Sequence, residues 1–193
     1  MSRTNHRASD LHRNIKHFIA MAAVGAGTVR GQRAGVQPAI REYLNKHVDL
    51  RRVPKKRGEF RQWLNRRTRG VLCALKGKAR KRPWGLARKV VNLFLRDCLY
   101  NHYLRHKYRL ARMETWLEVP LDSVVARELR KLAKETGWGP LPMWPGLKGR
   151  KDRKGLTPEV NARFQDFASW YARKKVGVSA RVFLDNYLWP LNR

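Results

Sequence analysis

Two residues stand where a nucleophile and a carboxylate could be held by the starts of two helices. Lys89 lies in the stretch PWGLARKVVN, residues 83–92, in which a Pro and Gly turn runs into an apolar helical pattern. Asp122 lies in VPLDSVVA, residues 119–126, where an acidic N-cap opens a second apolar pattern. If the two helix starts face each other, an amine and a carboxylate come together.

A lysine attacks an electrophilic carbon only as the neutral amine. The start of a helix carries positive potential, and an apolar wall and nearby basic residues add to the cost of an ammonium ion there. We therefore expect Lys89 to be a candidate nucleophile. Taken singly, each residue has a simpler explanation: Lys89 as a phosphate contact or surface charge, and Asp122 as an ordinary helix cap.

The charge of the chain points to a polyanionic partner. Its 193 residues include 44 Lys and Arg against 14 Asp and Glu, for a formal net charge of +30. So many positive charges repel one another in a folded protein. A negatively charged partner accounts for them best, with nucleic acid ahead of an anionic membrane surface. Seven Trp, six Tyr and six Phe within 42% hydrophobic residues exclude a disordered basic tail.

The hydrophobic spacing predicts an all-α fold of about eight helices, because no alternating strand pattern occurs. The expected helices span residues 10–24, 37–47, 59–75, 86–105, 122–134, 158–176 and 179–189. We expect a single basic domain, 1–193, with a cleft between two lobes: residues 1–50 plus 135–193, and residues 51–134 with a hairpin at 76–92. No apolar run is long enough to span a membrane.

The two motifs, in this order, resemble those of the helix-hairpin-helix DNA glycosylases. That superfamily has a Gly-x-Gly-x-Lys-x-Ala-Asn hairpin opening a buried helix, and Gly85 to Asn92 is similar to it, with Ala87 at the second glycine. Downstream the superfamily has an apolar-Asp element, and Val119 to Ser123 is similar. The C-terminal ARVFLDNYLW and the 33-residue gap between Lys89 and Asp122 are nearest to the archaeal-type oxidised-guanine glycosylase branch.

The resemblance implies a base-excision enzyme with lyase activity. Lys89 and Asp122 fall on the catalytic lysine and the essential aspartate. A damaged or modified nucleotide would rotate out of duplex DNA, and the lysine would form a Schiff base with its sugar. The hairpin would hold a DNA phosphate through backbone amides. The residues expected to contact DNA are Arg80, Lys81, Arg82, Gly85, Ala87 and Arg88.

Other residues offer weaker signals. Trp84, Trp138 and Trp144 lie in turn-rich basic segments and could stack on a flipped base, although anchoring a loop is the commoner role for such residues. His102 and His106 are four residues apart, a spacing that suits a metal, but no third ligand is near in the sequence, so we interpret them as solvent- or DNA-facing. We expect no metal and no small-molecule cofactor.

The alternative is a non-catalytic protein that packages or binds DNA or RNA, whose basic helices only resemble the motif. For the glycosylase we expect a monomer that binds double-stranded DNA and no membrane, in the cytoplasm with the nucleoid or in a nucleus. The sequence leaves open which base is excised, and whether the role is repair or defence against modified foreign DNA.

Overall fold

The computed structural model describes residues 3–79, 84–144 and 156–188, and every regular element in these ranges is helical. This confirms the all-α prediction. The α-helices are α1 (Arg3–Ala23), α2 (Val36–His47), α3 (Arg57–Ala74), α4 (Trp84–Tyr100), α5 (His102–Lys107), α6 (Ser123–Glu135), α7 (Pro158–Tyr171) and α8 (Leu184–Leu188). Short turns of other helix types are η1 (Leu50–Arg52), η2 (Leu110–Met113), η3 (Ala172–Val176) and η4 (Arg181–Phe183).

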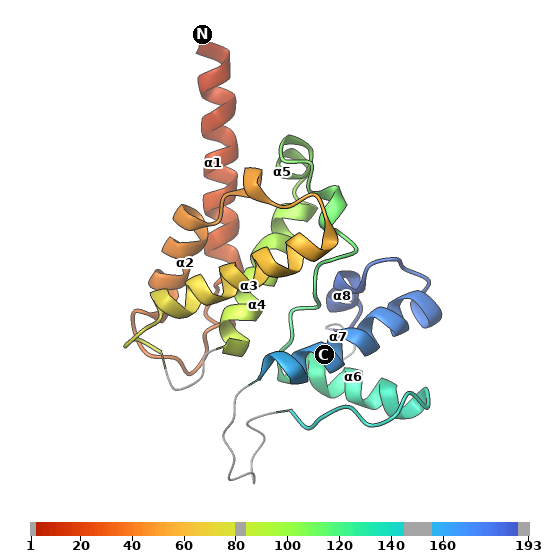
Figure 1. Cartoon of the computed structure of the whole chain (residues 1–193). Helices are drawn as coiled ribbons and strands as arrows, with labels where there is room; N and C mark the ends of the chain where they lie inside the picture. Colours follow the sequence, from red (N-terminus) through yellow and green to blue (C-terminus); the bar gives the residue numbers. More distant parts are fainter. Residues whose placement is uncertain (1–2, 80–83, 145–155, 189–193) are drawn as a thin grey trace.

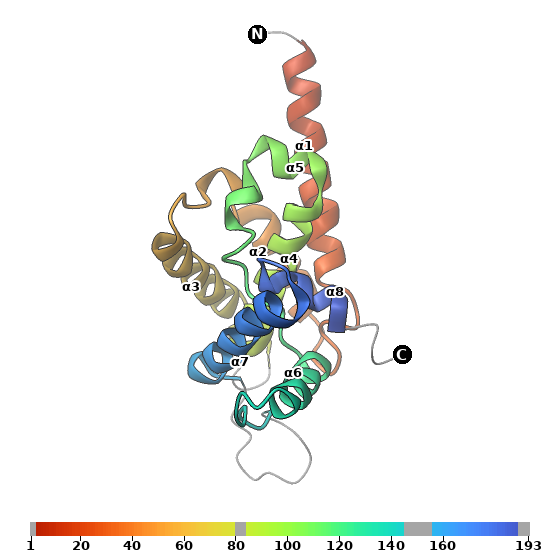
Figure 2. The same cartoon turned by 90° about the vertical axis from the view of Figure 1, so that its right-hand side faces the viewer.

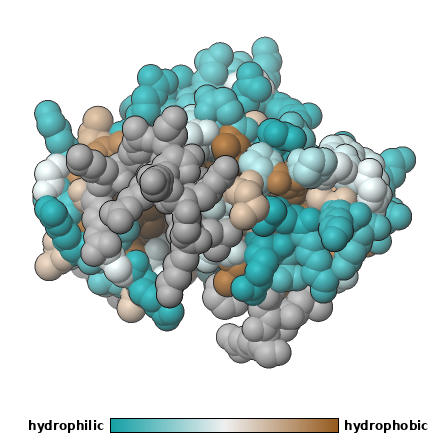
Figure 3. Space-filling model, turned by 90° about the horizontal axis from the view of Figure 1, so that it is seen from below, coloured by the Kyte–Doolittle hydropathy of each residue, from teal (hydrophilic) through white to brown (hydrophobic). Residues whose placement is uncertain are grey.

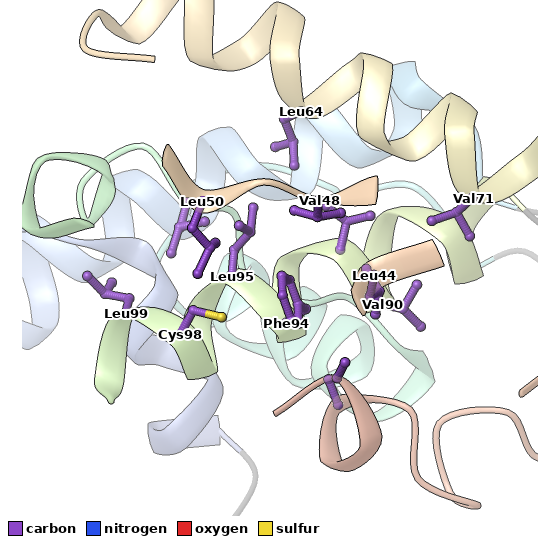
Figure 4. Packing of buried hydrophobic residues seen from close by; sticks show 14 of the residues in the cluster. Leu44, Val48, Leu50, Leu64, Val71, Val90, Phe94, Leu95, Cys98 and Leu99 are labelled. Atoms are coloured by element: carbon purple, nitrogen blue, oxygen red, sulfur yellow. The ribbon is translucent and has the colours of Figure 1, made fainter. Parts of the chain in front are cut away.

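Helix α4 forms the centre of the larger hydrophobic core. Val90, Phe94 and Leu95 are fully buried, because the apolar residues of α4 cover more of its circumference than one face and need partners on several sides. Helices α1, α2 and α3 supply those partners (Figure 1). Figure 4 shows side chains of α2 and α3, Leu44 and Leu64 among them, directed toward α4.

A second hydrophobic cluster lies between α6, α7 and α8 and includes Leu129, Phe164 and Leu184. Buried residues up to Leu117 lie in the first cluster and those from Val119 onward in the second, except that Ala180 and Val182 join the first. Residues 20–53 therefore pack with residues 60–117 and with Ala180 and Val182, a grouping that differs from the lobes expected from the sequence. The reason is α4, whose apolar surface takes up α1 and α2.

Two helix boundaries differ from the sequence prediction. The helix expected at 86–105 is divided at Asn101, whose backbone is extended and whose side chain caps α5 by accepting a hydrogen bond from the Leu104 amide at 3.1 Å. The first helix begins well before residue 10, and its N-terminal half projects beyond the other elements in both views (Figures 1 and 2). On it, Phe18 is 70% exposed.

In the described ranges, no helix is both long enough and apolar enough to cross a membrane. Hydrophilic side chains cover most of the described surface seen from below, with small hydrophobic patches between them (Figure 3).

Close packing of α2 on α3 depends on Gly70. A Cβ atom built on Gly70 would fall on the ring of Tyr43, from α2. A glycine inside a helix costs about 0.5–1 kcal/mol relative to alanine, so close packing is the compensating gain.

We predict that Gly70→Ala lowers the free energy of unfolding by about 1–2 kcal/mol, because the displaced ring strains the α2–α3 contact more than alanine helps the helix. Gly58→Ala in the same helix is the matched control, since its added Cβ meets nothing within 4 Å; it should be neutral or stabilising. Urea unfolding measures both. Equal effects of the two substitutions would contradict the packing role of Gly70.

Candidate functional site

The structure brings Lys89 and Asp122 together. Lys89 Nζ donates a hydrogen bond of 2.9 Å to Asp122 Oδ2, across 33 residues of chain. The side chains are only 16% and 19% exposed, so the pair is held in a largely enclosed position where an ion pair is screened less by water than at the surface. An amine and a carboxylate thus meet at the facing ends of α4 and α6.

Asp122 is oriented by the helix that it opens. Its Oδ1 accepts hydrogen bonds of 3.0 Å from the amides of both Val124 and Val125, which makes it the N-cap of α6. The other oxygen, Oδ2, remains for Lys89. The segment before it is fixed too, because Gln165 of α7 both donates to and accepts from the backbone of Val119, at 2.9 Å each.

Lys89 is placed differently from the sequence expectation. Helix α4 begins at Trp84, so Lys89 is its sixth residue and lies in the second turn. The helix dipole acts mainly within the first turn, so its influence on this amine is smaller than expected. The neighbour that acts on Lys89 at hydrogen-bond distance is the Asp122 carboxylate.

Next to Lys89, Arg88 enters a buried polar network. Its Nε and one terminal nitrogen donate to the two oxygens of Glu118, at 2.7 and 2.6 Å. Its other nitrogen donates to Asn65 and Thr68 of α3. Arg88 was expected to contact a DNA phosphate, but the structure places its guanidinium in hydrogen bonds inside the protein, and the residue is only 5% exposed.

Glu118 is the acceptor at the centre of this network. Besides Arg88, it accepts hydrogen bonds from Asn92 of α4 and Asn161 of α7, at 3.3 and 3.2 Å. Burial acts to raise the pKa of Glu118, but the hydrogen bonds and positive charge of Arg88 outweigh it, and the pKa is lowered from its usual value. The network therefore holds an ionised carboxylate between α3, α4 and α7.

The remaining hairpin residues fall into two groups. Arg80, Lys81 and Arg82 lie outside the described residues. Gly85 and Ala87 lie inside α4, and the Ala87 side chain is fully buried. A Cβ on Gly85 would come within 2.8 Å of the Leu156 side chain, so glycine permits Leu156 to pack on the start of α4.

The three tryptophans proposed for base stacking pack against the second cluster or its aromatic residues. Trp84 and Trp144 are partly buried there, and the Trp84 ring also lies 5.8 Å from the Arg88 guanidinium. Trp138 is 43% exposed, although its ring is 4.8 Å from that of Trp170. Of the three, Trp138 has the most surface to offer a ligand.

A cleft of about 360 Å³ lies between α3 and α7. Its lining includes Arg57 and Arg61 of α3, Asp166 of α7, and Glu118. Arg181 also lines the cleft; burial lowers its pKa, and its Nε donates to the Leu117 carbonyl at 2.9 Å. Lys89 and Asp122 are not among the lining residues. The cleft is connected to the ion pair through the buried network, because Glu118 lines the cleft and binds Arg88, the residue before Lys89.

Sequence reasoning missed this network. The one available signal was Glu118 itself, an acidic residue inside the apolar run WLEVPL, since a carboxylate in such a run needs a buried partner. Among the residues that the structure describes, no group of three or more His, Cys, Asp or Glu side chains could hold a metal ion.

Comparison with known proteins gives no relative from which to transfer a function. No family model matches the chain, and neither the curated proteins nor the solved structures contain a significant match. The glycosylase resemblance therefore depends on the motif residues and their geometry.

We predict that Glu118→Gln lowers the free energy of unfolding at pH 7 by about 3 kcal/mol, because it leaves the buried Arg88 without a counter-charge. The Glu118 pKa is lower in the folded chain than its ordinary 4.5. Its ionisation therefore stabilises the wild type fully above about pH 4.5 and progressively less as the pH falls through the folded value. The difference between wild type and variant should narrow over that acidic range.

Urea unfolding from pH 7 to pH 3 measures this difference. Glu114→Gln is the matched control, since Glu114 pairs with Arg105 at 2.8 Å where the arginine side chain is 41% exposed; it should cost no more than about 1 kcal/mol. A pH-independent difference for Glu118→Gln would contradict the assignment.

Proposed function

We propose that the chain is a DNA glycosylase with abasic-site lyase activity, of the helix-hairpin-helix kind. The single observation that supports this is the 2.9 Å contact between Lys89 Nζ and Asp122 Oδ2. The motif resemblance assigns these two residues to the nucleophile and the essential carboxylate, and they lie 33 residues apart in the sequence. A chance motif match would not require their side chains to meet.

Binding comes first in the proposed reaction. The net charge of +30 attracts the phosphate backbone of duplex DNA over long range. By the resemblance, the hairpin that opens α4 would hold a phosphate oxygen through its backbone amides. A damaged or modified nucleotide would then rotate out of the duplex toward Lys89.

The chemical steps balance with the groups at hand. Asp122 Oδ2 takes a proton from the Lys89 ammonium and frees the amine. As the glycosidic bond breaks, its electron pair leaves with the base, which takes the proton held by Asp122, and Nζ bonds to C1′ of the sugar. Nζ then gives a proton to Asp122, which passes it to O4′ as the C1′–O4′ bond opens, and a Schiff base results. The Asp122 carboxylate takes a proton from C2′, a C2′–C3′ double bond forms, and the 3′ phosphate leaves, which nicks the strand. Water finally hydrolyses the Schiff base and frees Lys89.

Asp122 has a second part in this scheme. Positive charge develops on the sugar as the base departs, and a fixed carboxylate nearby stabilises it. The two amides on Oδ1 hold the group in place before the reaction, so no reorganisation is needed during it. Its enclosure, at 19% exposure, strengthens the interaction.

The fold expected from the resemblance has two lobes with a cleft between them. One observation supports this part of the proposal, namely the two separate hydrophobic clusters. The cleft between α3 and α7 has neither Lys89 nor Asp122 in its lining. The alternative is a non-catalytic nucleic-acid-binding protein, which the net charge favours equally. That alternative gives the Lys89–Asp122 pair a structural role.

We predict that the wild-type chain, incubated with duplexes carrying modified or missing bases and borohydride, forms a covalent adduct that Lys89→Arg does not form. Borohydride reduces a Schiff base to a stable amine, and arginine keeps the charge of lysine without its nucleophilic amine. Gel electrophoresis of the adduct and the salt dependence of binding are the measurements.

Lys89→Arg should bind undamaged duplex with the salt dependence of the wild type, which separates chemistry from charge. The matched control is Lys174→Arg, an exposed lysine of η3, which should leave adduct formation unchanged. Salt-sensitive binding with no adduct on any substrate of a broad panel would refute the glycosylase and favour the non-catalytic alternative.

We further predict that Asp122→Asn loses at least about 100-fold in single-turnover excision while the N-cap of α6 is kept. Asparagine caps a helix as well as aspartate does, but it takes no proton from Lys89. Asp122→Ala should lose activity and also about 1 kcal/mol of stability through the lost cap. If Asp122→Asn remained active, Asp122 would be a structural cap alone.

A further inference from the structure

A basic pocket lies at the corner where α5 turns into η2. It has a volume of about 720 Å³, and its six lining residues are His102, Arg105, His106, Arg109, Ala111 and Arg112. Five of the six side chains are basic, so the pocket suits an anion. The neighbouring Tyr103 is 56% exposed and offers an aromatic face beside it.

Arg112 fixes this corner. Its guanidinium donates to the carbonyls of Val53 and Pro54, at 2.8 and 3.3 Å, and to that of Arg109, at 2.9 Å. Arg105 is paired with Glu114 at 2.8 Å. These two arginines therefore build the walls of the pocket and attach it to the segment before α3.

Arg109 has no such structural partner. Its side chain is exposed and, like that of His106, has no carboxylate partner within the described ranges. Its backbone φ is 51°, and within the described residues it is the one residue other than glycine with a positive φ. It follows the C-cap of α5, a position that glycine or asparagine occupies more easily than arginine. Its backbone is held in this conformation by hydrogen bonds, from its amide to the His106 carbonyl at 3.2 Å and from Arg112 to its carbonyl, whereas its side chain is exposed.

We propose that this pocket, with Arg109 and His106 as its ligand-binding groups, binds the phosphate backbone of duplex DNA at a second point, away from Lys89. The inference rests on the duplex DNA of the proposed function but not on its chemistry. Arginine suits this ligand because its planar fork matches the oxygens of a phosphate. With its net charge of +30, the chain repels other cations and favours a polyanion at this position.

The length of α4 sets the distance between the two sites. Tyr100, the last residue of α4, follows Lys89 by 11 residues, and a helix rises about 1.5 Å per residue, so the end of α4 lies about 16 Å from Lys89 along the axis. Base pairs in B-DNA are about 3.4 Å apart. A duplex aligned with α4 therefore needs at least about five base pairs beyond the nucleotide at Lys89 to reach the pocket, which follows that end.

The test is equilibrium binding of the full chain to undamaged duplexes of 8 and 20 base pairs over a range of salt concentrations. Arg109→Asn removes the charge and suits a positive φ, so the fold should be kept. Its salt slope on the long duplex should be smaller than that of the wild type by about 0.9, the value for one phosphate contact. The short duplex is also long enough to reach the pocket, so its slope should fall by a similar amount.

Two further variants sharpen the result. Arg109→Lys keeps the charge and should restore most of the slope, whereas Arg173→Asn, at an exposed arginine of η3, should leave the salt slope unchanged on both duplexes. A long-duplex slope equal to that of the wild type in Arg109→Asn would overturn the proposal, as would an equal loss in Arg173→Asn. A smaller slope in Arg109→Asn supports the second site whether or not borohydride traps an adduct, so the two proposals fail separately.

Discussion

The buried pairing of Arg88 with Glu118 is the interaction on which the arrangement of the site depends. It joins α4 to the segment that leads into Asp122, and the same two side chains reach Asn65 and Thr68 of α3 and Asn161 of α7. A buried ion pair of this kind often adds little net stability, since both charges lose water. Its strict geometry sets the position of the 118–122 segment relative to α4, and thus the position of Asp122 beside Lys89.

The arrangement separates two tasks between adjacent residues of one helix. Arg88 points into the protein and forms part of the scaffold, whereas Lys89 stands next to it and meets Asp122. Successive residues of an α-helix point in directions about 100° apart, so neighbours in sequence serve different surroundings. In the proposed enzyme, the scaffold charge is fully satisfied by Glu118 and does not compete for Asp122.

Much of the fold could be predicted from sequence, and the failures have physical causes. The all-α class and the core helix around Phe94 follow from hydrophobic spacing, and Asp122 as a helix cap follows from residue type. The role of Arg88 did not, because its partner Glu118 is 30 residues away and pairing across that distance leaves no local pattern. The break at Asn101 was missed because the end of α4 is marked by neither proline nor glycine, only by a single side chain that caps the start of α5.

The two oxygens of Asp122 have different partners, and this links the site to the local folding of α6. The Val124 and Val125 amides that hold Oδ1 belong to the first turn of that helix, and the ends of helices are where proteins open most readily. Each opening of this turn frees the carboxylate to rotate away from Lys89. The fraction of time for which the amine and the acid are aligned is therefore set by the fraying equilibrium of one helical turn, a quantity that amide hydrogen exchange at Val124 and Val125 reads directly.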